Sequence, residues 1–177
     1  MAPHVAATKA AHAELAAGIG ELRRGSRAME AAHAQDREYY ERRVRWMGIA
    51  VVVITTVVGA GIVTSLATST NTAEKAVFGS LSLVAAVIAA LNEKGPWGDQ
   101  RKAHLDSARA FCEVHRKAVD LGLNLEVGFV SRDDAREQLL ELEKTYDELK
   151  DKAPDVRHYD RAYAWVEADE RAHGRMK

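Results

Sequence analysis

Two stretches near the middle of the chain are apolar and almost without charge. The first, 46–67, has no charged residue. As a helix rising about 1.5 Å per residue it would reach roughly 33 Å, enough to cross a hydrocarbon core of ~30 Å. The second, 72–91, carries only Glu74 and Lys75, near its start, where charged side chains can reach lipid headgroups. The pattern predicts two membrane-spanning helices joined by a polar hairpin loop at 68–75.

Other interpretations of these stretches stay open. The first could be a buried core helix, although its only polar side chains are Thr and Ser, whose hydroxyls can bond to the preceding turn in lipid. Its β-branched residues would also suit a pair of strands, although no turn residue interrupts the run before Gly59 and the run exceeds ordinary strand length. The second stretch is short for a span and could be a re-entrant or core helix.

The segment before the first apolar stretch has helical patterning. Leu15, Ile19 and Leu22 follow helical spacing, and residues 23–26 resemble a break before a second helix over 28–45 that runs into the apolar stretch. The first twenty residues are rich in Ala, which favours a helix but offers little area to bury, so they could equally be disordered.

The segment after the second apolar stretch begins at a helix stop. Residues 92–96 end with Gly-Pro, and proline suits the first turn of the helix predicted over 97–121. One face of that helix carries Leu105, Ala108, Cys112, His115 and Val119. Residues 121–130 are apolar without a clear period, which favours a loop over a short strand.

Two further amphipathic helices complete the chain. Ser131 is a good N-cap for a helix over 132–152, whose apolar stripe consists of Leu139, Leu142, Tyr146 and Leu149. The last helix, predicted over 156–172, carries Tyr159, Tyr163 and Val166. The fold class is therefore all-α: a two-helix transmembrane hairpin with a cytoplasmic N-terminal helix and C-terminal helical hairpins. The corresponding segments are 1–45, 46–92 and 93–177.

Cations flank the two apolar stretches on one side. They gather just before the first stretch and just after the second, whereas the hairpin loop has a single Lys. By the positive-inside rule both termini are predicted to lie in the cytoplasm. The predicted membrane-interface anchors are Arg42, Arg43, Arg45, Trp46 and Trp97. No apolar signal-peptide core precedes them, and the single Cys112 fits a reducing compartment.

Composition sharpens this picture in one respect. The 177 residues hold 25 Lys and Arg against 26 Asp and Glu, a net charge of -1, which excludes strong electrostatic capture of nucleic acid. Only Glu74 and Lys75 of these charges lie between Trp46 and Asn92, and such segregation argues against an ordinary soluble domain.

The sequence predicts no catalytic residues, no cofactor and no metal site. His104 and His115 share a helix face three turns apart, too distant for one metal, and surface or interhelix histidines are the better interpretation. Gly18-Ile19-Gly20 and Gly59-Ala60-Gly61 lack the strand and the Lys-Ser/Thr of a phosphate loop. The chain is therefore predicted not to be an enzyme.

Small residues recur at four-residue steps in both apolar stretches, and such faces let helices approach closely. They are predicted helix-packing or pore faces: Thr56, Gly59, Ala60 and Thr64 in the first, and Gly79, Ser82, Ala86 and Ala90 in the second. They could hold the two spans of one chain together, or they could form the interface between several hairpins around a weakly polar pore.

The order of parts resembles the SLATT family, two-transmembrane effectors of bacterial conflict and anti-phage systems. The resemblance lies in EYYERRVRWMGIAVVV (38–53), in the short hairpin, and in LNEKGPWGDQRKAHLDSARAFCEVHRK (91–117), where Trp97, His104, Ala108 and Phe111 follow the family's aromatic-then-helix pattern. Gly95-Pro96 departs from the continuous helix expected there, and residues 123–177 have no assigned match.

The resemblance implies a membrane effector held inactive until a nucleotide signal or a partner protein, such as a nucleotide-signalling enzyme or sensor of the same operon, drives assembly. Its partners would be membrane lipids and further copies of the chain, which as a homo-oligomer would permeabilise the inner membrane. Two alternatives stay open: a membrane-anchored helical scaffold that recruits a cytoplasmic protein through residues 131–172, and a phage holin. A soluble helical bundle with a buried hairpin is the remaining fallback.

Overall fold

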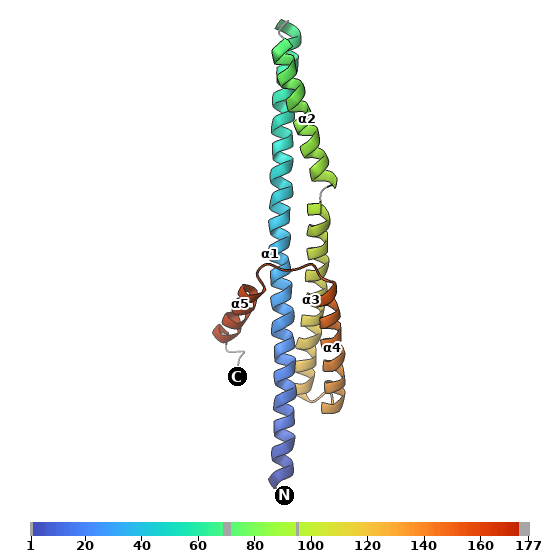
Figure 1. Ribbon diagram of the computed structural model, residues 1–177. Helices are drawn as coiled ribbons and strands as arrows, with labels where there is room; N and C mark the ends of the chain where they lie inside the picture. Colours follow the sequence, from blue (N-terminus) through green and yellow to red (C-terminus); the bar gives the residue numbers. More distant parts are fainter. Residues whose placement is uncertain (1, 69–71, 95, 174–177) are drawn as a thin grey trace. The chain divides into compact units, whose positions relative to one another are not determined.

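Five α-helices make up the computed structural model, which describes residues 2–68, 72–94 and 96–173. Side chains are described for residues 10–60, 77, 79–91 and 96–173. The helices are α1 (Ala2–Thr68), α2 (Thr72–Lys94), α3 (Pro96–Val127), α4 (Arg132–Lys152) and α5 (Tyr159–Ala172), shown in Figure 1. The described residues contain no strand, so the prediction of an all-α fold is confirmed.

The chain divides into two compact units. One consists of Met1–Asp36 and Ala103–Lys177 and is called the bundle here; the other, Arg37–Lys102, is called the apolar unit. Helix α1 contributes its N-terminal part to the bundle and its C-terminal part to the apolar unit.

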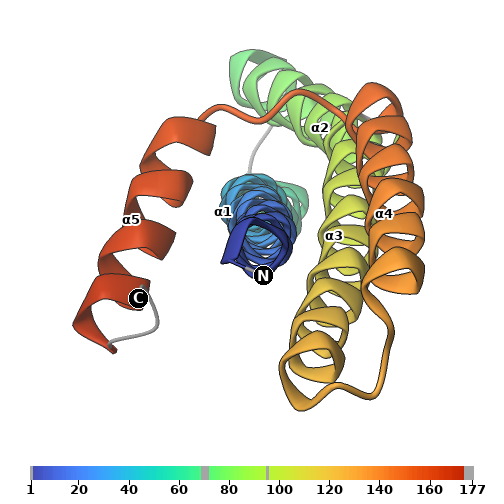
Figure 2. The same cartoon turned by 90° about the horizontal axis from the view of Figure 1, so that it is seen from below.

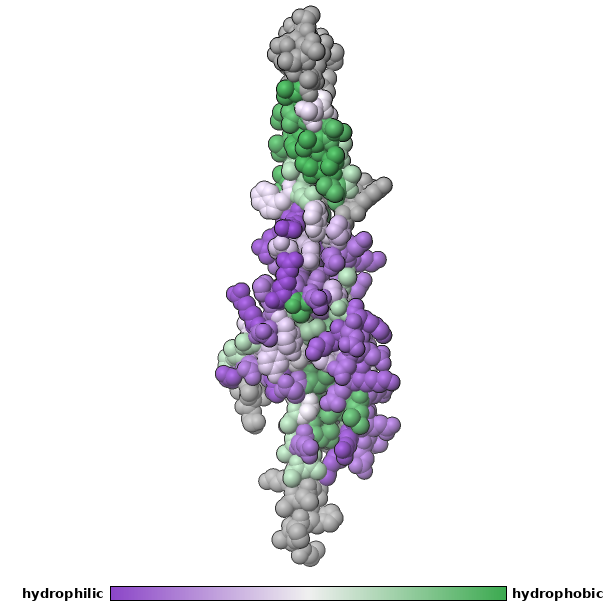
Figure 3. Space-filling view, viewed as in Figure 1, coloured by the Kyte–Doolittle hydropathy of each residue, from purple (hydrophilic) through white to green (hydrophobic). Residues whose placement is uncertain are grey.

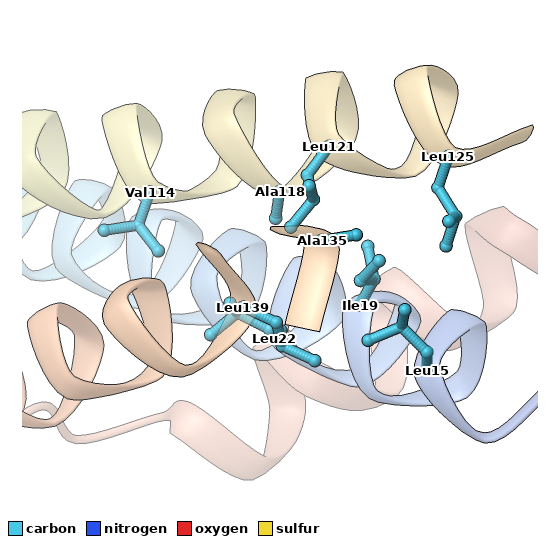
Figure 4. Close-up of a cluster of buried hydrophobic side chains, with 9 residues drawn as sticks. All are labelled: Leu15, Ile19, Leu22, Val114, Ala118, Leu121, Leu125, Ala135 and Leu139. Carbon is cyan, nitrogen blue, oxygen red and sulfur yellow. The ribbon is translucent and has the colours of Figure 1, made fainter. Parts of the chain in front are cut away.

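The core of the bundle lies where α1 meets α3 and α4. Buried residues of α1 recur at alternating steps of four and three, the spacing of a coiled-coil seam: Leu15, Ile19, Leu22, Ser26, Met29, His33 and Asp36. The first three pack against Val114, Ala118, Leu121 and Leu125 of α3 and Ala135 and Leu139 of α4 (Figure 4). Three helices of the bundle therefore share one hydrophobic core.

Helix α5 covers a second face of α1, and Figure 2 shows α1 between α5 on one side and α3 with α4 on the other. Ala28 and Ala32 of α1 pack there against Ala162 and Val166. Small residues on α1 let the two helices approach closely. At the edge of this contact, Arg23 Nη2 lies 2.7 Å from Glu170 Oε1, an ion pair that joins positions far apart in the sequence.

The predicted break at residues 23–26 is wrong, because α1 continues through it. Ser26 is fully buried, and its hydroxyl donates to the carbonyl oxygens of Leu22 and Arg23 at 2.8 and 3.1 Å, so the helix itself satisfies this polar group. A Cβ on Gly25 would lie 3.2 Å from Tyr146 Oη. Glycine serves here to admit a neighbouring side chain, and it does not end the helix.

Helix α3 differs from its prediction in length and in the face it buries. It extends to Val127, so most of the predicted loop at 121–130 is helical, and only Gly128, with φ of +79°, takes a left-handed conformation suited to glycine. The buried residues are His104, Phe111, Val114, Ala118, Leu121 and Leu125. The buried face lies about one position away from the predicted one. The five residues of the predicted face are therefore only half buried: Leu105, Ala108, Cys112, His115 and Val119.

The two last helices follow their predictions closely. Helix α4 spans Arg132–Lys152 as expected, and Ser131 Oγ accepts a hydrogen bond from the Asp134 amide at 3.2 Å, so the N-cap is confirmed. Leu139 is buried, and Leu142, Tyr146 and Leu149 pack against the same core. Helix α5 begins at Tyr159, three residues later than predicted.

The turn between the apolar helices is also shorter than predicted. Helix α1 ends at Thr68 and α2 begins at Thr72, so residues 72–75 of the predicted loop are helical, and 69–71 lie outside the described residues. The predicted helix stop before Pro96 is confirmed, because α2 ends at Lys94 and α3 begins at Pro96.

Candidate functional site

Within the apolar unit, α1 and α2 meet along a narrow seam of small residues. Val58 of α1 and Ala85 of α2 are buried in this seam, with exposed fractions of 5% and 2%. A groove of about 300 Å³ follows the seam and is lined by Val51, Thr55, Val58, Gly59, Ser82, Ala85, Ala86 and Ala89. The two apolar stretches of the sequence therefore face each other.

The predicted small-residue faces coincide with this seam in part. Three predicted residues, Gly59, Ser82 and Ala86, line the groove. Thr55 and Ala89 also line it, each one position before a predicted residue (Thr56 and Ala90) that does not.

The remaining residues of these faces lie elsewhere in the apolar unit. Thr56, Ala60, Gly79 and Ala90 are exposed, and the side chain of Thr64 lies outside the described residues. A Cβ on Gly79 would meet nothing within 4 Å. That these exposed residues pack against another copy of the chain stays a prediction.

The rest of the apolar unit presents large apolar side chains outward. Val52, Val53 and Val57 of α1 are more than half exposed, and so is Leu83 of α2, at 67%. Figure 3 shows hydrophobic residues gathered over one part of this unit. By length and composition, α1 is apolar enough to cross a membrane. Contiguous exposed apolar surface of this kind marks contact with lipid or with other proteins.

Three of the described hydroxyl groups in this unit make hydrogen bonds inside their own helices. Thr55 Oγ1 donates to the Val51 carbonyl at 2.8 Å, Thr56 Oγ1 to the Val52 carbonyl at 2.7 Å, and Ser80 Oγ to the Val77 carbonyl at 2.8 Å. No water is required to satisfy these three groups, so they can enter an apolar environment at little cost.

A second groove, of about 530 Å³, lies at the polar end of the apolar unit. It is lined by Tyr39, Arg42, Arg43, Trp46, Met47 and Trp97, and it is called the basic-aromatic groove here. It brings together four of the five predicted interface anchors from α1 and α3. Arg45 is the fifth; it is 71% exposed at its side chain, lies 3.8 Å from Glu41 and does not line the groove.

The bundle contains a buried histidine pair that the sequence did not predict. His33 Nδ1 and His104 Nδ1 lie 2.9 Å apart, so one must donate and the other accept. Phe111 stacks on His33 with ring centroids 5.5 Å apart, and both histidines are at most 2% exposed. His104 is therefore an interhelix histidine, one of the two alternatives predicted from the sequence.

Burial keeps this pair uncharged at neutral pH. Removal from water, reinforced by His104, lowers the pKa of His33 from 6.5 to about 4, and burial also lowers the pKa of His104. Asp36 opposes both shifts, but its Oδ2 already accepts a hydrogen bond from the Arg157 amide at 3.1 Å. Two histidines without a third ligand do not make a metal site, and no cluster of three or more candidate ligands occurs among the described side chains.

One signal could have identified the histidine pair. His33 continues the four-and-three spacing that begins at Leu15, and that spacing is readable in the sequence once polar residues are allowed in the seam. The pair joins two helices that are far apart in the sequence, so the spacing of histidines within one helix does not predict it.

The comparison with known families gives one match. The model of the SMODS and SLOG-associating 2TM effector domain family 4 matches residues 30–172, which covers both apolar stretches and most of the bundle. Neither the curated proteins nor the solved structures contain a match to the chain.

Proposed function

The chain belongs to the SMODS and SLOG-associating 2TM effector domain family 4, and on that premise we propose that it is a membrane effector of a bacterial conflict or anti-phage system. Residues 46–67 and 72–91 cross the inner membrane as a hairpin, and both termini lie in the cytoplasm. The functional segments are then 1–45, 46–92 and 93–177. The protein acts without a catalytic residue, a cofactor or a metal.

The observation that carries this proposal is the outward apolar surface of the apolar unit. Val53 and Val57 on α1 and Leu83 on α2 are 55%, 55% and 67% exposed. Each would cost on the order of 1 kcal/mol to hold in water at that exposure. A hydrocarbon environment removes this cost, and the three hydroxyl groups bonded within their helices add little.

Oligomerisation and permeabilisation form the second part of the proposal. The exposed small residues Thr56, Ala60 and Ala90 give further copies of the hairpin a close-packing face, since association in lipid depends on close van der Waals contact. The family name links the domain to SMODS and SLOG systems, so a nucleotide signal, or a sensor from the same system, drives this assembly through the cytoplasmic bundle.

The test is induced expression in a bacterium that also contains the activating system, followed by membrane fractionation and a measurement of the entry of a membrane-impermeant dye. The variant pair Ala60→Leu and Ala90→Leu enlarges two exposed small residues, and Val57→Leu is a matched control on an exposed apolar position. We expect dye entry and growth arrest with the natural chain and with the control, and their loss in the Leu pair, with all three proteins in the membrane fraction.

Other results would contradict specific parts of the proposal. Natural protein recovered in the soluble fraction would exclude a membrane effector. A membrane-bound protein that arrests no growth even in the presence of its activating system would favour the alternative, a membrane-anchored scaffold. Unchanged dye entry in the Leu pair would exclude the small-residue face as the contact between copies.

A further inference from the structure

The residues of the basic-aromatic groove share one face of α1. Tyr39, Arg42, Arg43, Trp46 and Met47 follow steps of three and four, which place them on the same side of the helix. Trp97, from the second residue of α3, closes the groove from the other side. Two guanidinium groups and two indoles therefore surround one open volume of about 530 Å³, within the ~300–1,000 Å³ typical of small-molecule sites.

The two arginines of the groove have weak protein partners. Arg42 Nη2 lies 3.9 Å from Glu38 Oε2, and both side chains are about 70% exposed, so solvent screens this pair strongly. Arg43 lies over the Tyr39 ring at 5.0 Å, and no described side chain forms an ion pair with it. Both guanidinium groups thus keep donors for an external anion, and their planar forks suit phosphate oxygens.

Acidic residues nearby do not cancel this positive charge. Glu41 lies between Arg37, at 3.5 Å, and Arg45, at 3.8 Å, on a part of α1 outside the groove lining. Between residues 37 and 47, α1 carries four arginines and two glutamates. The local field is therefore positive, and it attracts an anionic ligand.

The groove also lies at a boundary along the chain. Trp46 and Met47 are the first two residues of the charge-free stretch, whereas Arg42 and Arg43 belong to the charged segment before it. A ligand that fills the groove meets cations at one end and aromatic and thioether surface at the other. A phospholipid has this same order of phosphate, glycerol and acyl chain.

We propose that the basic-aromatic groove binds the phosphate of an anionic phospholipid. Arg42 and Arg43 donate hydrogen bonds to the phosphate oxygens, and Trp46, Met47 and Trp97 contact the glycerol and the upper acyl chain. This inference rests on the proposed membrane location, and it extends the proposed function by assigning a selective lipid site. A free phosphate ester shares the chemistry of the headgroup but lacks the apolar part that the groove is built to contact.

The test uses the full chain in nanodiscs of phosphatidylcholine containing a minor fraction of phosphatidylglycerol. Lipids retained on the protein after release are identified by native mass spectrometry. The Arg42→Gln/Arg43→Gln variant removes both groove cations, and the matched control Arg37→Gln/Arg45→Gln removes two neighbouring cations outside it. We expect about tenfold lower retention of phosphatidylglycerol in the groove variant, and a change of less than about twofold in the control.

Three outcomes would overturn the inference. Equal losses in the groove variant and the control would show general attraction to a charged surface. Retention of phosphatidylcholine equal to that of phosphatidylglycerol would show no headgroup selectivity. Displacement of phosphatidylglycerol by soluble glycerol phosphate, in an Arg42- and Arg43-dependent manner, would assign the site to a free phosphate ester.

The same samples separate this inference from the proposed function. Protein that stays in the bilayer after alkaline extraction but retains lipids unselectively would contradict the phospholipid site and leave the membrane effector standing. Protein that leaves the bilayer on alkaline extraction would contradict both.

Discussion

The bundle and the apolar unit are both helical, but they bury their apolar residues differently. In the bundle, leucine, isoleucine, valine and phenylalanine from α1, α3 and α4 meet in shared cores. In the apolar unit, Val58 and Ala85 are the hydrophobic residues buried among the described side chains, while larger neighbours face outward. The bundle is built to remove apolar surface from water, whereas the apolar unit retains surface that only a second apolar environment can cover.

Polar groups show the same contrast. In the bundle several of them bond between positions far apart in the sequence, as in the Arg23–Glu170 ion pair, the His33–His104 contact and the bond from the Arg157 amide to Asp36. In the apolar unit the hydroxyls of Thr55, Thr56 and Ser80 bond within a single helix. Matched substitutions of one residue type in each unit can therefore separate the two environments.

The largest difference is expected for leucine to arginine. Leu83 in α2 and Leu140 in α4 are 67% and 60% exposed, so in water both Leu83→Arg and Leu140→Arg should change stability little. In a membrane, an arginine at position 83 costs about 3 kcal/mol near the bilayer centre, or about 100-fold in insertion. Alkaline extraction of membranes should release the Leu83→Arg protein and retain the Leu140→Arg protein. Equal behaviour of the two variants would place both leucines in the same solvent.

Acid should weaken the bundle and leave the apolar unit unchanged. The pKa of His33 is lowered from 6.5 to about 4 by burial and by His104. Between these values the unfolded chain takes up a proton that the folded chain does not, so stability is lost as the pH falls from about 6.5 towards 4. The expected loss is on the order of 2–3 kcal/mol.

Hydrogen exchange of α3 peptides, corrected for intrinsic rates, measures this loss. A His33→Phe/His104→Phe variant should abolish the pH dependence, whereas His158→Gln, at an exposed position, should leave it intact. If the double variant keeps the full dependence, the histidine pair is not its origin.

Valine to alanine distinguishes the two cores. Val114 in the bundle and Val58 in the apolar unit are 3% and 5% exposed. Val114→Ala should cost about 2 kcal/mol, because a cavity forms and the transfer of apolar surface from water is lost. Val58→Ala should cost about 1 kcal/mol or less, because lipid offers similar contacts and the hydrophobic effect does not hold helices together there. Both costs can be measured by denaturant titration in mixed micelles, where the fluorescence of Trp165 reports on the bundle and that of Trp46 and Trp97 on the apolar unit. Equal costs for the two variants would argue that protein, and not lipid, shields Val58 from water.

The smallest difference is expected for serine to alanine. Ser131 Oγ accepts from the Asp134 amide at the start of α4 and donates to Asp134 Oδ2 at 2.7 Å, so Ser131→Ala should cost about 1 kcal/mol through the lost cap. Ser80 Oγ donates to the Val77 carbonyl within its own helix, and Ser80→Ala should be close to neutral. The same titrations compare them, and a large cost at Ser80 would indicate a hydrogen-bond partner on another copy.

The features visible in the sequence are those carried by long runs of one residue class. The charge-free stretches, the stripe on α4 and the Ser131 cap depend on neighbours in sequence, and the structure has all of them. The sequence also singles out Arg42, Arg43, Trp46 and Trp97 one by one as membrane-interface anchors, and that role stays a prediction. That they line a single groove was not predictable, because it depends on how α3 lies beside α1 within the apolar unit.

Features set by tertiary packing were missed. Gly25 and Ser26 have the composition of a helix break, but the contact with Tyr146 and the bonds to Leu22 and Arg23 accommodate them within α1. The sequence did not reveal that the α1 seam continues through His33, because polar residues occupy apolar positions there. A buried histidine at this position needs a hydrogen-bond partner, and the partner, His104, lies on another helix.

The central claim, that residues 46–67 and 72–91 form a membrane-spanning hairpin with both termini inside, is most directly tested by the side from which the turn can be labelled. Ser69→Cys in a Cys112→Ser background places one thiol between the two stretches, and Ala11→Cys in the same background places it in the bundle. A membrane-impermeant maleimide should label position 69 in spheroplasts and position 11 only after lysis. Labelling of both positions only after lysis would contradict the hairpin.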